Sequence, residues 1–147
     1  MRDKLTVPIV QFHFLHKAQN LTQRNRLKAF LVTLFKKEKT LLSSLNYIFC
    51  SDKYLLDINN QFLQHNYYTD IITFNLATGS AGVEGEVYIS LDRVRENATV
   101  LNEYFNRELH RVIFHGALHL CGYGDKSAEE IKLMRQKEEV YLDLYFA

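Results

Sequence analysis

The most constraining stretch of the sequence runs from His115 to Asp125, with the letters HGALHLCGYGD. In a helix, residues i and i+4 lie on one face, so the imidazoles of His115 and His119 are neighbours. Both can reach one ion at the ~2.0–2.1 Å typical of zinc–nitrogen bonds. Gly122 and Gly124 allow the helix to end and the chain to turn back. We therefore predict Asp125 as a third ligand, which leaves a fourth position for water, as in catalytic zinc sites.

The segment around the two histidines predicts a buried helix over residues 107–121, with Asn106 as its N-cap. Apolar residues follow helical spacing along one side of this helix, and two more lie on the other side. A helix that is apolar nearly all round is usually buried. The two histidines share the remaining strip with Glu108, where unpaired imidazoles would be costly. The apolar residues are Leu109, Val112, Ile113, Phe114, Gly116, Ala117, Leu118 and Leu120.

Other interpretations of this segment stay open from its pattern alone. Two histidines at this spacing also occur as packed core residues that bind no metal. A zinc peptidase is disfavoured, because Gly116 stands where the H-E-x-x-H pattern has its general-base glutamate. Cys121 lies inside the segment, but its neighbour Leu120 belongs to the apolar stripe. We interpret this thiol as a packing residue rather than a ligand.

The string HGALHLCGYGD closely resembles the H-G-x-L-H-L-x-G-Y signature of the YbeY family, bacterial rRNA maturation factors regarded as metal-dependent endoribonucleases. Two upstream segments are similar to family segments as well. Residues 68–74 (YTDIITF) resemble P-T-D-V-L-S-F, and residues 85–90 (GEVYIS) resemble G-D-I-x-I-S. The order and spacing agree, and the resemblance covers roughly residues 45–140. It implies a small sheet with helices over one face and a central metal-binding helix.

This chain departs from the family pattern at two positions. The family commonly has a histidine ligand where Asp125 stands, and an aspartate is an acceptable but harder ligand that selects zinc less strongly against manganese or nickel. The family usually also has an arginine, credited with helping cleavage or phosphate binding, at the position of Leu63. His65 is the nearest replacement, since a protonated imidazole can donate to a phosphate. Arg93 and Arg95 are alternatives.

Glu86 matches an acidic position of the family at the start of a strand. It either positions a metal-bound water or forms a polar strand end. Asp70 has turn chemistry as its simplest role, although the resemblance places its segment beside the active cleft. The predicted catalytic residues are His115, His65 and Glu86, and the predicted ligands of one zinc ion per chain are His115, His119 and Asp125.

The rest of the chain alternates strands and helices, which predicts an α/β (α+β) fold: a small mixed four-stranded sheet with about five helices and a central metal-binding helix. Pro8 suggests that the first strand is an edge strand. The predicted strands cover residues 5–14, 45–50, 71–75 and 85–90. The other predicted helices cover residues 22–39 with Thr22 as N-cap, 51 or 52 to about 64, 92 to about 104, and a final helix that follows a capping box at residues 127–130 and ends near Leu144.

Length and composition set further bounds. We expect one domain over residues 1–147. The net charge of +1 lacks the strongly basic signature of a general nucleic-acid binder, so any RNA contact should be local. The lysine-rich run at residues 36–39 suits a helix C-terminus, and we interpret it as a solvated helix end rather than an RNA patch. Two cysteines fit a reducing cytoplasm, and no apolar run is long enough for a membrane span.

The resemblance implies a zinc-dependent single-strand endoribonuclease in rRNA maturation, including small-subunit rRNA 3′ end processing, and in ribosome biogenesis. The expected partners are rRNA, the small ribosomal subunit and ribosome-associated proteins, and the expected location is the cytoplasm. A second hypothesis is a ribosome-assembly factor that binds RNA or protein around a structural metal without cutting. The missing arginine favours that hypothesis, whereas the open coordination position favours catalysis. A small-molecule metallohydrolase is a third alternative.

Overall fold

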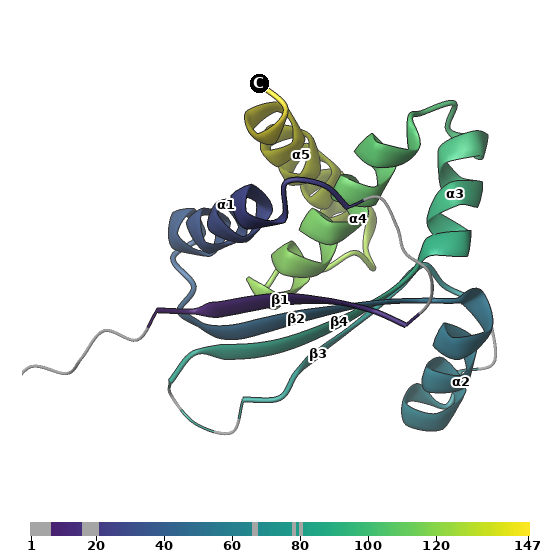
Figure 1. The fold of residues 1–147 in the computed structure, drawn as a ribbon, viewed down its shortest axis with the longest axis horizontal. Coiled ribbons are helices and arrows are strands. Elements are labelled where there is room, and N and C mark those ends of the chain that lie inside the picture. Colours follow the sequence, from purple (N-terminus) through teal and green to yellow (C-terminus); the bar gives the residue numbers. More distant parts are fainter. Residues whose placement is uncertain (1–6, 16–20, 66–67, 78, 80) are drawn as a thin grey trace, which may run out of the picture.

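The computed structural model describes residues 7–15, 21–65, 68–77, 79 and 81–147 (Figure 1). Within them, the strands form one mixed sheet in the order β1-β2-β4-β3, in which β1, β2 and β4 are parallel and β3 is antiparallel to β4. The predicted fold class is confirmed, and β1 is an edge strand, as Pro8 suggested. The strands are β1 (Ile9–Phe14), β2 (Leu42–Cys50), β3 (Ile71–Asn75) and β4 (Val83–Ser90). The helices are α1 (Arg24–Lys37), α2 (Asp52–Leu63), α3 (Leu91–Val100), α4 (Phe105–Leu120) and α5 (Ala128–Tyr145).

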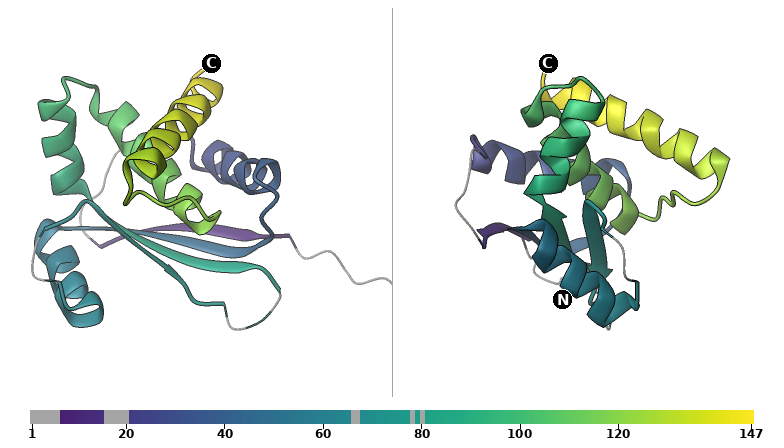
Figure 2. Two further views of the ribbon diagram at one scale, coloured as in Figure 1. Left: turned by 180° about the vertical axis from the view of Figure 1, so that it is seen from behind. Right: turned by 90° about the vertical axis from the view of Figure 1, so that its right-hand side faces the viewer.

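The two faces of the sheet are covered unequally. Helices α1, α4 and α5 lie over one face, with α4 in the centre, and α2 lies on the other side (Figures 1 and 2). The larger core fills the space between the sheet and these three helices, and it includes Val87, Ile113 and Phe114. A smaller core around Leu55 and Ile72 lies under α2. Helix α4 therefore lies mostly inside the protein, as its apolar surface predicted.

Close packing of α4 on the sheet depends on a glycine. A Cβ atom on Gly116 would lie 2.9 Å from side-chain carbons of both Ile71 and Val87, which is too close without a shift of those side chains. On the same helix, the main-chain carbonyl of Ile113 accepts a 2.7 Å hydrogen bond from the buried hydroxyl of Tyr47 on β2. These contacts fix the height and rotation of α4 above the sheet, and so they fix the direction of His115 and His119.

Several predicted helix ends were wrong. Helix α1 has Gln23, in the left-handed conformation, as its N-cap rather than Thr22. Helix α4 starts at Phe105 after Tyr104, so Asn106 lies inside its first turn and is not the cap. Neither cap makes a side-chain hydrogen bond, so a rule based on capping side chains could not find them. Helix α3 ends at Val100, because the chain soon turns through positive φ.

Other details were predicted correctly. The hydroxyl of Ser51 caps α2 by accepting from the backbone N–H of Tyr54. The capping box of Ser127 and Glu130 starts α5. On α5, Met134 is buried, whereas Ile131 and Val140 are exposed. Residues 5 and 6 of the first predicted strand lie outside the described residues. In the described part of the chain, no helix combines the length and apolarity needed to cross a membrane.

Candidate metal centre

Two of the three histidines of α4, His115 and His119, line a cleft of about 550 Å³. Its walls come from β3, α3, α4, α5 and the loop between α4 and α5. His115 and His119 lie one turn apart, with ring centroids 4.5 Å apart and planes at 86°. The structure thus places both imidazoles at the wall of an open cavity, even though their helix is largely buried.

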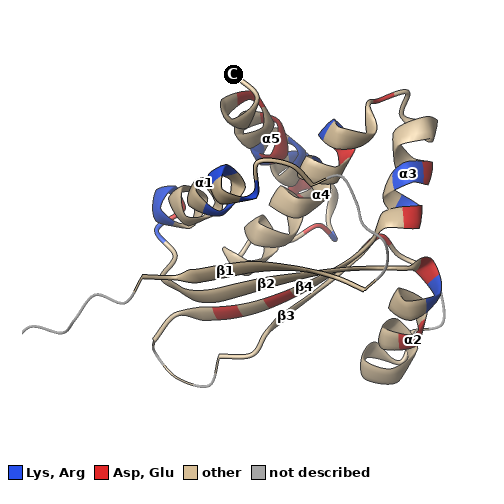
Figure 3. Cartoon of the chain, viewed as in Figure 1, with Lys and Arg blue, Asp and Glu red and all other residues tan. Residues whose placement is uncertain are grey.

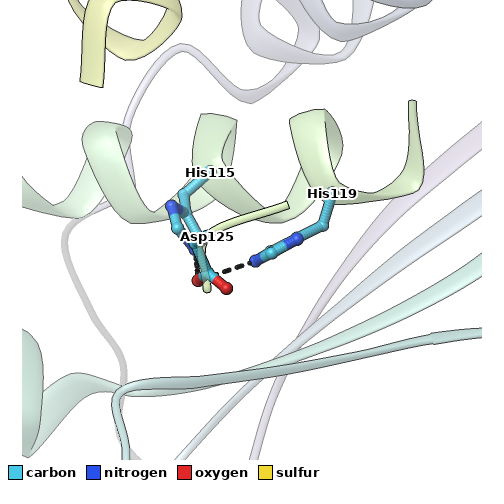
Figure 4. A group of neighbouring side chains, drawn as sticks. All are labelled: His115, His119 and Asp125. Carbon is cyan, nitrogen blue, oxygen red and sulfur yellow. Dashed lines mark hydrogen bonds and ion pairs between the residues drawn. The ribbon is translucent and has the colours of Figure 1, made fainter. Parts of the chain in front are cut away.

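Asp125 meets both histidines, as the glycine-rich exit predicted (Figure 4). Its Oδ2 atom lies 3.3 Å from Nε2 of His115 and 3.1 Å from Nε2 of His119. One ligand atom from each residue falls within 4.8 Å of the others. Gly122 has a φ of +103°, which allows the chain to turn back after α4.

The Nδ1 atom of each of these two histidines makes a hydrogen bond that orients its ring. Nδ1 of His115 lies 2.7 Å from a carboxylate oxygen of Glu138, and Nδ1 of His119 lies 2.8 Å from the main-chain oxygen of Tyr123. Both partners can only accept, so both Nδ1 atoms carry the proton and donate. The Nε2 lone pairs then point to the site shared with Asp125. This is the usual support of metal-binding histidines.

The donor set fits a divalent zinc ion. Two imidazole nitrogens and one carboxylate oxygen are ligand types of catalytic zinc, and the open cleft leaves room for a further ligand. Cys121 does not belong to this set and packs against the main core. Burial raises the pKa of its thiol to about 11, which opposes the thiolate that a metal would need.

A second interaction network holds the loop that carries Asp125. The hydroxyl of Tyr123 donates a 2.6 Å hydrogen bond to Glu38, which follows the last residue of α1. Glu38 also accepts from Lys137 at 3.1 Å and from the hydroxyl of Tyr141, both on α5. Tyr123 is thus fixed at both its carbonyl and its hydroxyl, so the residue after α1 and helix α5 together position the loop that carries Asp125.

The cleft contains more carboxylates than cations. Burial raises the pKa of Asp70, whose carboxylate accepts a 3.1 Å hydrogen bond from the amide of Asn97. Burial also raises the pKa of Glu108, against the opposing charge of Arg111. For His115, burial lowers the pKa, but the hydrogen bond and charge of Glu138 and the nearby aspartates outweigh it, and the net shift is upward.

The structure does not bring Glu86 to the cleft. On β4, the neighbours Gly85 and Val87 face α4: a Cβ atom on Gly85 would meet Leu120 at 2.6 Å, and Val87 lies against the Cα of Gly116. Strand residues alternate between the two faces, so Glu86 points to the opposite one. There it accepts a 2.8 Å hydrogen bond from the hydroxyl of Tyr88. The expectation that Glu86 positions a metal-bound water does not fit this placement.

The residues considered as replacements for the family's arginine also lie away from the cleft. His65 follows the end of α2 and is exposed, on the α2 side of the sheet. Arg93 pairs with Asp52 at 2.7 Å, and Arg95 stacks over Phe105. Leu63 is likewise at the end of α2. None of these four side chains lines the cleft.

Sequence reasoning missed three charged residues of the cleft. Glu138 is 2% exposed, and Arg111 and Arg135 line the same cavity. Arg111 is tied to several carboxylates, whereas Arg135 has a side chain 62% exposed and one ion-pair partner, Glu138, at 3.4 Å. A signal for Glu138 was present. It follows Met134 by one helical turn and precedes Tyr141 by three residues, so it occupies a buried position of α5.

Comparisons with known proteins show related sequences and a similar fold. The family model described as Endoribonuclease YbeY matches residues 12–145. A protein of Cytophaga hutchinsonii with the same name is 50% identical over 124 residues, covering 84% of this chain and 87% of its own. A namesake from Christiangramia forsetii is 44% identical over 110 residues, covering 75% and 76%. The solution structure of TM1509 from Thermotoga maritima superposes with a TM-score of 0.58 at 27% identity, covering 94% of this chain and 89% of the other.

Proposed function

Since the chain belongs to the YbeY family of endoribonucleases, we propose that it cleaves single-stranded RNA with one zinc ion held by His115, His119 and Asp125. The proposal extends to rRNA maturation, including the 3′ end of small-subunit rRNA, and to ribosome biogenesis. The observation that carries it is the convergence of both Nε2 atoms and a carboxylate oxygen in an open cleft. The hydrogen-bond partners of both Nδ1 atoms, Glu138 and the carbonyl of Tyr123, support a site prepared for a metal ion.

The bound ion would act as a Lewis acid that lowers the pKa of water and offsets negative charge on the phosphate. Glu138 and the carbonyl of Tyr123 keep the two imidazoles in the tautomer that presents Nε2. We assign Arg135 to the phosphate, because it lines the cleft and its guanidinium remains largely exposed. Arg135 would thus make the phosphate contact that the sequence suggested for His65.

Asp70 is our candidate for proton transfer in the cleft. Its side-chain hydrogen bond comes from the neutral amide of Asn97, and burial raises the pKa of its carboxyl. A carboxylate with a raised pKa is better suited to take a proton from an attacking oxygen near neutral pH. Asp70 would thus serve in place of Glu86, which faces the other side of the sheet.

The partners we propose are rRNA within the small ribosomal subunit and ribosome-associated proteins. We also propose that residues 1–147 act as one unit in the cytoplasm. Both cysteines are free, and Cys50 is buried with its pKa raised to about 12, chiefly by burial. Inert free thiols of this kind are compatible with a reducing compartment.

The second candidate function is a non-cleaving ribosome-assembly factor with a structural metal. Leu63 favours it, since this apolar residue stands where the family usually has an arginine. In that case the metal would hold the loop of Asp125 against α4. RNA would bind without being cut.

Removal and return of the metal separates the two candidates. The zinc-loaded protein should cut single-stranded RNA, lose this activity with a chelator and regain it with zinc. The His119→Ala variant should still bind RNA but not cut it. Zinc-loaded protein that binds RNA without cutting would contradict the nuclease and support the assembly factor.

A further inference from the structure

The charge of the chain is concentrated on one segment. Residues 24–39 contain six Lys or Arg residues and one carboxylate, so this segment carries a formal charge of +5. The remaining residues contain twelve cations and sixteen carboxylates, a formal charge of −4. Figure 3 shows the cations along α1 and at its C-terminal end. The net charge of +1 therefore hides a strongly basic surface.

The cations of this segment also differ from the others in their partners. None of the six makes an ion pair within the part of the chain that the structure describes, whereas six of the nine other described Lys and Arg residues do. The segment's one carboxylate, Glu38, has a side chain only 8% exposed and is used by Tyr123, Lys137 and Tyr141. Its charge faces inward and does not neutralise its lysine neighbours.

Three exposed lysines, Lys36, Lys37 and Lys39, surround this inward-facing glutamate, and we call them the α1 lysine cluster. The segment of the cluster contacts the loop that carries Asp125, because Glu38 accepts a hydrogen bond from Tyr123, whose carbonyl accepts one from His119. The contacts of Glu38 and Tyr123 therefore join the loop that carries Asp125 to the segment of these three lysines, which make no ion pair among the described residues.

The sequence alone favoured a solvated helix end for these lysines, but we propose that the α1 lysine cluster binds the phosphate backbone of the RNA strand that is cut at the metal centre. This inference rests on the proposed function. The cleft itself contains four carboxylates and only two guanidinium groups, so even a bound divalent ion leaves it without a net positive charge. A polyanion needs attraction from outside the cleft, and unpaired lysines supply most of the salt-dependent affinity for nucleic acids.

The test compares two double variants that lower the net charge equally. Lys36→Gln with Lys37→Gln removes two members of the cluster, and Lys53→Gln with Lys132→Gln removes two exposed lysines on α2 and α5. Binding of an unstructured RNA oligonucleotide to zinc-loaded protein is measured against salt concentration. Zinc content and thermal unfolding of each variant verify that it is folded.

For the cluster variant, the slope of log affinity against log salt should fall by about 1.4, since each single-strand phosphate contact contributes roughly 0.7. Affinity should weaken roughly 25-fold at ~0.1 M salt, with cleavage at saturating RNA retained. The control variant should match the parent. An unchanged slope in the cluster variant, with RNA still bound and cut, would overturn this inference alone and leave an acidic protein as the alternative partner. A parent that binds no RNA would overturn the proposed function as well.

Discussion

The side chains of β4 have different surroundings on the two faces of the sheet. On the α4 side, Gly85 and Val87 of β4 allow α4 to pack closely, and the cleft lies between α4 and its neighbours. On the α2 side, Glu86 and Tyr88 bond each other beside a small core. Both faces carry acidic residues, but the group that could hold a metal, His115, His119 and Asp125, lies on the α4 side. Alternation along the strand decides which acidic residue can reach the site.

Removal of a ligand on the α4 side should have the largest effect. His119→Ala deletes one of the two imidazoles that meet Asp125. Loss of a residue that only supports a ligand lowers metal affinity by up to roughly 100-fold. Loss of the ligand itself should therefore lower zinc affinity by more than this. Competition with a chromophoric zinc chelator measures this. RNA cleavage should be lost in parallel. If the variant kept the zinc affinity of the parent, His119 would not be a ligand, and the contrast between the two faces of the sheet would fail.

Removal of the negative charge of Glu138, which contacts His115, should have the next largest effect on zinc affinity. Glu138→Gln keeps a hydrogen-bond acceptor for His115 but removes the negative charge, and zinc affinity should fall roughly 10- to 100-fold. Glu139→Gln is the matched control, since Glu139 also contacts Arg111 but not His115. Equal losses in both variants would show that the effect comes from the arginine network.

The affinity for zinc should also depend on pH. The net pKa of His115 is raised, despite burial that lowers it, by Glu138, Asp70 and Asp125. A protonated imidazole cannot bind the ion, so protons compete with zinc at every pH below this raised value. Affinity should fall about tenfold per pH unit there, and titration calorimetry across pH 5 to 8 would measure it. Affinity that rises on acidification would contradict this assignment.

Changes on the α2 side should have the smallest effect. Glu86→Gln and His65→Gln alter side chains outside the cleft, so zinc affinity should stay within about twofold of the parent. The same competition assay applies to both variants. A large loss in either would mean that this side of the sheet contributes to the metal centre, and the contrast between the two faces would fail.

Local spacing made much of the site predictable. The four-residue interval of His115 and His119, with the glycines before Asp125, indicated the group that the structure brings together. Alternating strands and helices likewise indicated the fold. The missing parts depend on packing between elements far apart in the chain. Glu138 reaches His115 from 23 positions away, and Arg135 enters the cleft because α5 crosses over α4.

Glu86 shows that a sequence match alone does not place a side chain in the site. Glu86 matches an acidic position of the family in sequence, but this match does not state which face of the strand packs against α4. The close approach of Gly85 to Leu120 decides that, and this contact spans two elements. The starts of α1 and α4 were likewise missed, because neither N-cap makes the side-chain hydrogen bond that a capping pattern predicts.

The most direct test of the central claim is the zinc content of the purified protein, measured for the parent, Asp125→Ala and Asp125→His. Asp125 contacts both imidazoles, and the histidine variant restores the ligand that the family commonly uses. We predict about one zinc ion per chain in the parent and in Asp125→His, with a sharp fall in Asp125→Ala. A parent without stoichiometric metal after zinc is supplied, or an alanine variant that keeps a full ion, would contradict this metal centre.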